Sequence, residues 1–171
     1  MSFYKCFYCE SKLKGKVSEI DHYKEVSEYK EGAYEWENLF LSCENCNGKI
    51  PHQIIPVTEA LNPFLDTDQE IKKHLTFEDE QITMKPDSIL GSKTIQKFRL
   101  DSPSLDMLRL KQIKIFQQCC ISVQKNMILE GRNKMSEKEL ESLRSFANPD
   151  KSFSLMFEIL LEKMQINQQT K

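Results

Sequence analysis

The sequence contains little that would mark an exported, membrane-spanning or nucleotide-hydrolysing protein. Its 171 residues include only five glycines, and they form no glycine-rich loop of the kind that wraps a phosphate chain. No segment approaches the roughly 18 consecutive apolar residues of a membrane-spanning helix. The first residues, Met1 to Cys6, have no apolar signal-peptide core. We therefore expect a cytoplasmic protein that makes no membrane contact and is not itself an NTPase.

An excess of either charge sign is also missing. Lysine and arginine number 24 and aspartate and glutamate 26, which gives a net charge of -2. That balance argues against strong nonspecific binding of nucleic acid by the whole surface. The charge balance of residues 85–134 differs from this average, because the segment contains ten basic residues and only four acidic ones. This segment forms either a local basic surface or an ordinary solvated helix face.

Six cysteines are what the sequence does have, and four of them form two C-x-x-C pairs, Cys6/Cys9 and Cys43/Cys46. The cytosol disfavours disulfides. Each pair can place two thiolates on one turn, and four thiolates are a common tetrahedral ligand set for structural zinc. Four core cysteines or one redox pair are the alternatives, although a thioredoxin-like pair would need a βαβ setting that this pattern lacks.

Periodicity and turn residues predict an α+β fold in two parts. Residues 1–56 form a zinc-stapled ββα module, and residues 57–171 form a β-hairpin and a helical half that packs on the module, docks a partner, or does both. The expected strands are 17–22 and 38–43, followed by a short helix after Cys43, a connector over 53–68, a hairpin over 75–85 turning at 79–80, and helices over 92–98, 104–129, 137–146 and 152–164. We expect Trp36 to pack in the module's core and Cys119 and Cys120 to be buried thiols.

Four polar residues lie where these module elements end or begin. Asp21 and His22 end the first expected strand, Asn38 starts the second, and Asn47 directly follows Cys46. An imidazole is a natural general base near neutral pH. Carboxylate and amide oxygens are ligands that Mg²⁺ accepts. The four residues therefore predict a catalytic centre beside the zinc site.

These residues resemble the HNH (ββα-metal) endonuclease family. The resemblance rests on four segments: Cys6-Phe7-Tyr8-Cys9, Glu19-Ile20-Asp21-His22, Asn38-Leu39-Phe40-Leu41-Ser42-Cys43 and Cys46-Asn47-Gly48-Lys49. It implies a zinc-stapled ββα fold that cleaves DNA phosphodiesters with one divalent metal ion.

The resemblance also implies roles for single residues. His22 would be the general base that deprotonates the attacking water. Asp21 and Asn47 would ligate catalytic Mg²⁺ or Mn²⁺, and Asn38 would hold the catalytic loop through backbone hydrogen bonds. Lys49 lies two residues after Asn47 rather than the family's usual three, so it is either a phosphate contact or a plain solvated lysine.

Residues 3–120 further resemble the HNH subunit of Septu and retron-associated antiphage systems, through segments such as Tyr34-Glu35-Trp36-Glu37 and Leu61-Asn62-Pro63. That likeness implies an ABC-type ATPase encoded nearby as partner. Two alternatives stay open. One is a stand-alone HNH nuclease of restriction or toxin type, and the other is a non-catalytic zinc module that binds nucleic acid or protein.

Overall fold

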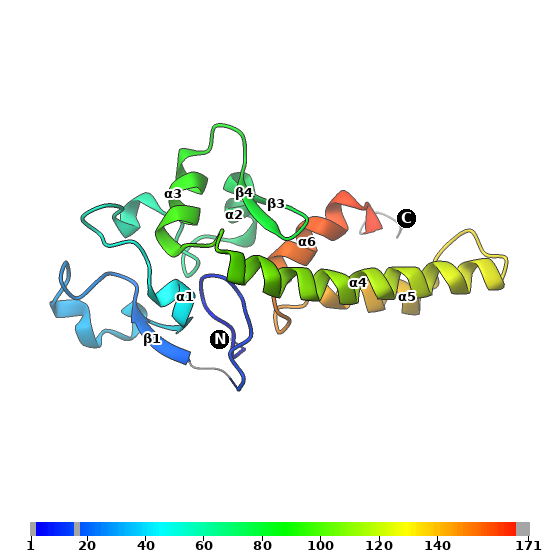
Figure 1. The fold of residues 1–171 in the computed structure, drawn as a ribbon, viewed down its shortest axis with the longest axis horizontal. Coiled ribbons are helices and arrows are strands. Elements are labelled where there is room, and N and C mark those ends of the chain that lie inside the picture. The colour runs from blue at the N-terminus through cyan, green and yellow to red at the C-terminus, as the bar shows by residue number, and fades with distance from the viewer. Residues whose placement is uncertain (1–2, 16–17, 167–171) are drawn as a thin grey trace.

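The structure is a computed structural model that describes residues 3–15 and 18–166. An N-terminal region, residues 3–56, lies beside a C-terminal region, residues 57–166 (Figure 1). Helix α4 (Pro103–Leu129) runs along the long axis of the molecule. Within the described residues, no helix combines the length and the apolar character needed to cross a bilayer. The mixed helix-and-strand architecture confirms the predicted α+β class.

The N-terminal region has the predicted ββα order. Strand β1 (Ser18–His22) pairs antiparallel with β2 (Leu39–Cys43), so that Asp21 lies opposite Phe40. Helix α1 (Glu44–Asn47) starts directly after β2 and ends after one turn. The two strands are joined by two short 3-10 helices, η1 (Glu31–Tyr34) and η2 (Trp36–Asn38).

The C-terminal region contains a helix that the sequence did not predict, directly after the expected connector. After the 3-10 turn η3 (Val57–Glu59), helix α2 spans Asp68–His74. Thr67 caps α2 by accepting a hydrogen bond from the Glu70 amide at 3.2 Å. None of its residues is buried, so α2 has no apolar stripe for periodicity to detect. The predicted hairpin follows as β3 (Leu75–Glu78) and β4 (Gln81–Met84), with the turn at 79–80.

Helices form the rest of the C-terminal region, as predicted. They are α3 (Ile89–Phe98), α4, α5 (Glu137–Arg144), the 3-10 turn η4 (Ser145–Ala147) and α6 (Ser154–Lys163). Helix α3 begins three residues earlier than expected, because Ser88 caps it by accepting from the Gly91 amide at 3.0 Å. Helix α5 begins with a capping box formed by Ser136 and Glu139.

One continuous core joins the two regions. The Phe98 ring stacks on the Tyr8 ring with centroids 4.4 Å apart. The Phe153 amide donates to the Glu10 carbonyl at 3.3 Å, so the start of α6 also contacts the N-terminal loop. Cys119 and Cys120 are half-buried and lie at the edge of this core, so the prediction that both are buried is wrong.

Candidate nuclease site and zinc cluster

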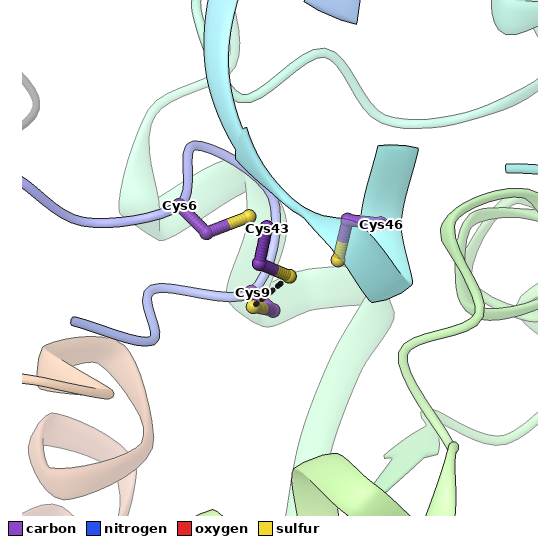
Figure 2. A group of neighbouring side chains, drawn as sticks. All are labelled: Cys6, Cys9, Cys43 and Cys46. Carbon is purple, nitrogen blue, oxygen red and sulfur yellow. Dashed lines mark hydrogen bonds between the residues drawn. The ribbon is translucent and has the colours of Figure 1, made fainter. Parts of the chain in front are cut away.

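The four cysteines of the two C-x-x-C pairs converge on one point. Cys6 and Cys9 come from the N-terminal loop, Cys43 ends β2, and Cys46 lies on α1 (Figure 2). Their four sulfur atoms all lie within 4.8 Å of one another. The Cys9 and Cys43 sulfurs are 3.8 Å apart. Zn–S bonds of about 2.3 Å in a tetrahedron place sulfurs about 3.8 Å apart, so this cluster is suited to zinc.

The electrostatics of the cluster also fit a bound cation. The hydrogen bond with Cys43 raises the pKa of both Cys9 and Cys46, whereas the hydrogen bond with Cys46 lowers the pKa of Cys43. Thiols this close cannot all ionise together unless a positive charge offsets their mutual repulsion. A zinc ion would supply that charge, because metal-bound cysteines are held as thiolates.

Arg109 on α4 is a second positive charge near the cluster. Its side chain is only 2% exposed, and its guanidinium donates to the Leu100 carbonyl at 2.8 Å and to Asp106 at 2.9 Å. Burial lowers the pKa of Arg109, while Cys9 acts in the opposite direction. Arg109 and Cys9 also line the same cavity between the two regions. The C-terminal region therefore places a buried cation near the cysteine cluster of the N-terminal region.

His22, the predicted general base, is half-buried at the end of β1. Its Nε2 lies 2.9 Å from the Ala33 carbonyl oxygen in η1. Because a carbonyl can only accept, Nε2 carries the proton in this contact and the neutral ring keeps its lone pair on Nδ1. The tautomer and the ring orientation are thus set by the loop between the strands.

Asp21, the predicted metal ligand next to His22, lies on the face of β1 that meets α1. Its carboxylate oxygens lie 2.7 and 2.6 Å from the Lys49 ammonium, and it accepts a hydrogen bond from the Tyr8 hydroxyl at 2.6 Å. The Lys49 side chain is 5% exposed, so the alternative of a plain solvated lysine is wrong. Lys49 also donates to the His22 carbonyl and so joins the chain after α1 to the end of β1.

Asn47, the other predicted metal ligand, has a partner that sequence reasoning missed. Its amide nitrogen donates to the Glu19 carboxylate. Glu19 precedes Asp21 by two residues, and the period of two in a strand puts both carboxylates on the face that meets α1. This alternation of side chains along the strand could have identified Glu19 as a site residue from the sequence. Within the described residues, no hydrogen bond joins Asp21 or Asn47 to His22 or to each other.

Asn38 is buried and holds the loop between the strands. Its side-chain oxygen accepts from the Lys24 amide at 2.7 Å, and its side-chain nitrogen donates to the carbonyls of Lys24 and Gly32, each at 3.0 Å. Asn38 thus closes the loop that begins just after His22. Trp36, two residues earlier, is 81% exposed, so the prediction that it packs in the core is wrong.

The side chain of Lys97 on α3 contacts the segments that follow β1 and α1. Its side chain is completely buried, and its ammonium lies 2.8 Å from the Glu25 carboxylate and donates to the Ile50 carbonyl. Glu25 also accepts from the backbone amide and ring of His52, each at 3.2 Å. A side chain of the C-terminal region therefore links the segment that follows β1 to the segment that follows α1.

Two comparisons with known proteins bear on this site. Residues 6–53 match the family model of the HNH endonucleases. The chain is also 28% identical over 127 residues to the Septu protein PtuB of Bacillus thuringiensis, a match that covers 73% of this chain and 47% of that protein. The chain thus spans about half the length of the curated relative it matches.

Proposed function

Because residues 6–53 match the family model of the HNH endonucleases, we propose that this chain is a metal-dependent endonuclease that hydrolyses phosphodiester bonds in DNA. The observation that supports this most directly is the setting of His22 within these residues. Its ring is oriented by the Ala33 carbonyl at 2.9 Å, which leaves Nδ1 as the proton acceptor. In the proposed reaction, Nδ1 takes the proton of the attacking water, and the hydroxide formed attacks the scissile phosphorus. The bond from phosphorus to the departing sugar oxygen breaks, and that oxygen takes up a proton from solvent.

We propose that the oxygen donors on the face of β1 that meets α1 hold a catalytic Mg²⁺ or Mn²⁺. Asp21 and Asn47 would be its ligands, with Glu19 as a third donor on the same face, and the ion would replace the Lys49 ammonium that pairs with Asp21. When bound, such an ion supplies positive charge that stabilises the phosphate oxygens and the leaving group. The chain's own contribution is to keep Asn38 bonded to the loop that orients His22.

We propose that the four cysteines bind one structural zinc ion. Each C-x-x-C pair contributes two thiolates, and the ion ties the N-terminal loop to the β2–α1 junction. Residues 1–56 would then be the nuclease module. Residues 57–171 would be a helical extension that packs on this module through α3 and the start of α6.

We further propose that the chain is the nuclease subunit of an antiphage complex in the cytoplasm, with an ABC-type ATPase as its partner. The similarity to a Septu protein supports this assignment. The charge supports it as well, because a net charge of -2 gives the chain little electrostatic attraction of its own for DNA. A partner would then supply affinity and register on the substrate.

Plasmid cleavage with Mg²⁺ or Mn²⁺ tests this function. We expect His22→Ala to lower the cleavage rate at least 10³-fold, since it removes the general base, without changing zinc content or melting temperature. His74→Ala is the matched control and should cleave like the wild type, because His74 lies on α2 and contacts Ser88. Equal cleavage by His22→Ala and wild type would contradict the proposed role of His22.

The same assay separates the alternative functions. Full activity of the isolated chain would favour a stand-alone nuclease of restriction or toxin type. Zinc binding without cleavage, with or without the ATPase, would favour a non-catalytic module that binds nucleic acid or protein. Cleavage that appears only when the ATPase subunit is added supports the proposed complex.

A further inference from the structure

Two aromatic side chains project into solvent from the loop that orients His22. Tyr34 is 96% exposed and Trp36 is 81% exposed. We refer to residues 28–37 as the acidic aromatic loop. Tyrosine and tryptophan are enriched among the residues that contribute most to the binding energy of protein interfaces.

The acidic aromatic loop is held in a defined shape. Gly32 is buried, and a Cβ atom there would lie 2.1 Å from the ring of Tyr29. The Tyr29 hydroxyl donates to the Glu35 carboxylate at 2.8 Å, and Asn38 donates to the Gly32 carbonyl at 3.0 Å. The two exposed aromatics are therefore presented on a fixed backbone, which lowers the entropy lost when they bind a partner.

The charge of this loop indicates what kind of partner it fits. Its charged side chains are Lys30 and four exposed glutamates at positions 28, 31, 35 and 37. Such a surface repels the phosphates of DNA. It attracts a protein surface that presents lysine and arginine, whose cations pair with carboxylates and lie over aromatic rings.

The position of the loop connects it to the candidate catalytic centre. Ala33, whose carbonyl contacts His22 Nε2 at 2.9 Å, is the residue directly before Tyr34. A partner that binds Tyr34 and Trp36 would therefore lie beside the residue proposed as the general base.

We infer that the acidic aromatic loop is the docking surface for a basic face of the ATPase partner. This inference rests on the proposed function, which supplies the ATPase. A direct contact of the loop with DNA is the competing assignment.

Trp36 makes the inference testable, because it is the single tryptophan of the chain. Biosynthetic labelling with 5-fluorotryptophan gives one ¹⁹F resonance, which reports on the loop alone even when the partner contains tryptophan. We expect this resonance to shift and broaden when the unlabelled ATPase subunit is added. We expect no change with a DNA duplex added without Mg²⁺ or Mn²⁺. A shift with DNA and none with the ATPase, or no shift with either, would overturn the inference.

Variants provide the second measurement. The double variant Tyr34→Ala, Trp36→Ala should weaken ATPase binding at least tenfold and remove the ATPase-dependent part of DNA cleavage, while the ATPase-independent part stays as in wild type. The matched control is Ile128→Ala, Leu129→Ala, which shortens two side chains of similar exposure, 79% and 84%, at the far end of α4. It should bind the ATPase normally.

The outcomes of these measurements also distinguish a failure of the docking surface from a failure of the proposed nuclease function. Equal ATPase binding by wild type and the Tyr34→Ala, Trp36→Ala variant would overturn the docking surface and leave the nuclease function intact. Loss of binding in the control variant to the same degree would likewise overturn it. Absence of cleavage and of ATPase binding in the wild type would instead contradict the proposed function itself.

Discussion

The N-terminal region is built from two strands of five residues and a helix of four, whereas the C-terminal region contains a helix of 27 residues. Short elements bury little apolar surface, so such a region needs another source of stability. The cysteine cluster is one such source. The other is the C-terminal region itself, which contributes Phe98 to the ring stack with Tyr8.

The buried charges of the two regions make the comparison more specific. The fully buried lysine and arginine of the C-terminal region, Lys97 and Arg109, both act on the N-terminal region. Lys97 pairs with Glu25 in the segment after β1, and Arg109 lies near the cysteine cluster. The C-terminal region thus supplies the N-terminal region with positive charges as well as apolar contacts. The four predictions that follow test how far each region depends on the other.

Loss of zinc should have the largest effect and should separate the two regions. Cys43→Ser removes one of four thiolates, and structural zinc contributes on the order of 10 kcal/mol to the folding of small domains. We expect amide protection in β1, β2 and α1 to disappear while α4 keeps its protection, measured by hydrogen exchange with mass spectrometry. Cys119→Ser, outside the cluster, should retain zinc and protection. Unchanged protection in β2 of Cys43→Ser would contradict a structural role for zinc.

Arg109→Met should be the most damaging single change in the C-terminal region. It keeps a long side chain but leaves Asp106 and the Leu100 carbonyl without their partner, and breaking a buried ion pair costs about 3–5 kcal/mol. Urea unfolding would measure the loss. Lys111→Met, exposed on the same helix, should change the free energy of unfolding by less than about 0.5 kcal/mol. Similar losses of unfolding free energy in both variants would show that Arg109 stabilises the fold no more than an exposed lysine does.

Lys97→Met should cost roughly 2–3 kcal/mol, less than Arg109→Met, because the Glu25 carboxylate left behind keeps its hydrogen bonds from His52. Its effect should also spread to the N-terminal region, as faster amide exchange after β1 and after α1. Lys93→Met is the control on the same helix, because Lys93 forms a more exposed ion pair with Glu59. If the faster amide exchange is confined to α3, Lys97 does not stabilise the segments after β1 and α1.

The smallest effect concerns the start of α5, far from the N-terminal region. The hydrogen bond from Arg132 lowers the pKa of Glu139 to about 2. A lowered carboxyl pKa stabilises the fold above the unfolded value, near 4.3, and this contribution is lost as pH falls through the folded value. The difference in melting temperature between wild type and Glu139→Gln should therefore be positive at pH 7 and vanish near pH 2. A difference that stays constant with pH would contradict this assignment.

The sequence predicted the features whose signals are local. The two C-x-x-C spacings predicted the cluster of four sulfurs, and helical periodicity predicted α4 to within one residue of its start. Helix α2 escaped prediction because it buries none of its residues. Glu19 was overlooked although strand alternation places it beside Asp21. The roles proposed for Asp21, Asn38 and Asn47 stay predictions.

What the sequence determined by itself is the chemistry that the chain can offer: thiols in pairs, an imidazole at a strand end and carboxylates two residues apart. Only the tertiary structure decided how these groups are held. It buried Lys49 against Asp21, brought Lys97 from α3 to Glu25 and left Trp36 in solvent. The physical reason is distance along the chain. Spacing within one strand or turn fixes which side chains are neighbours, whereas contacts between residues 72 positions apart, as in the Lys97–Glu25 pair, depend on the packing of the whole core.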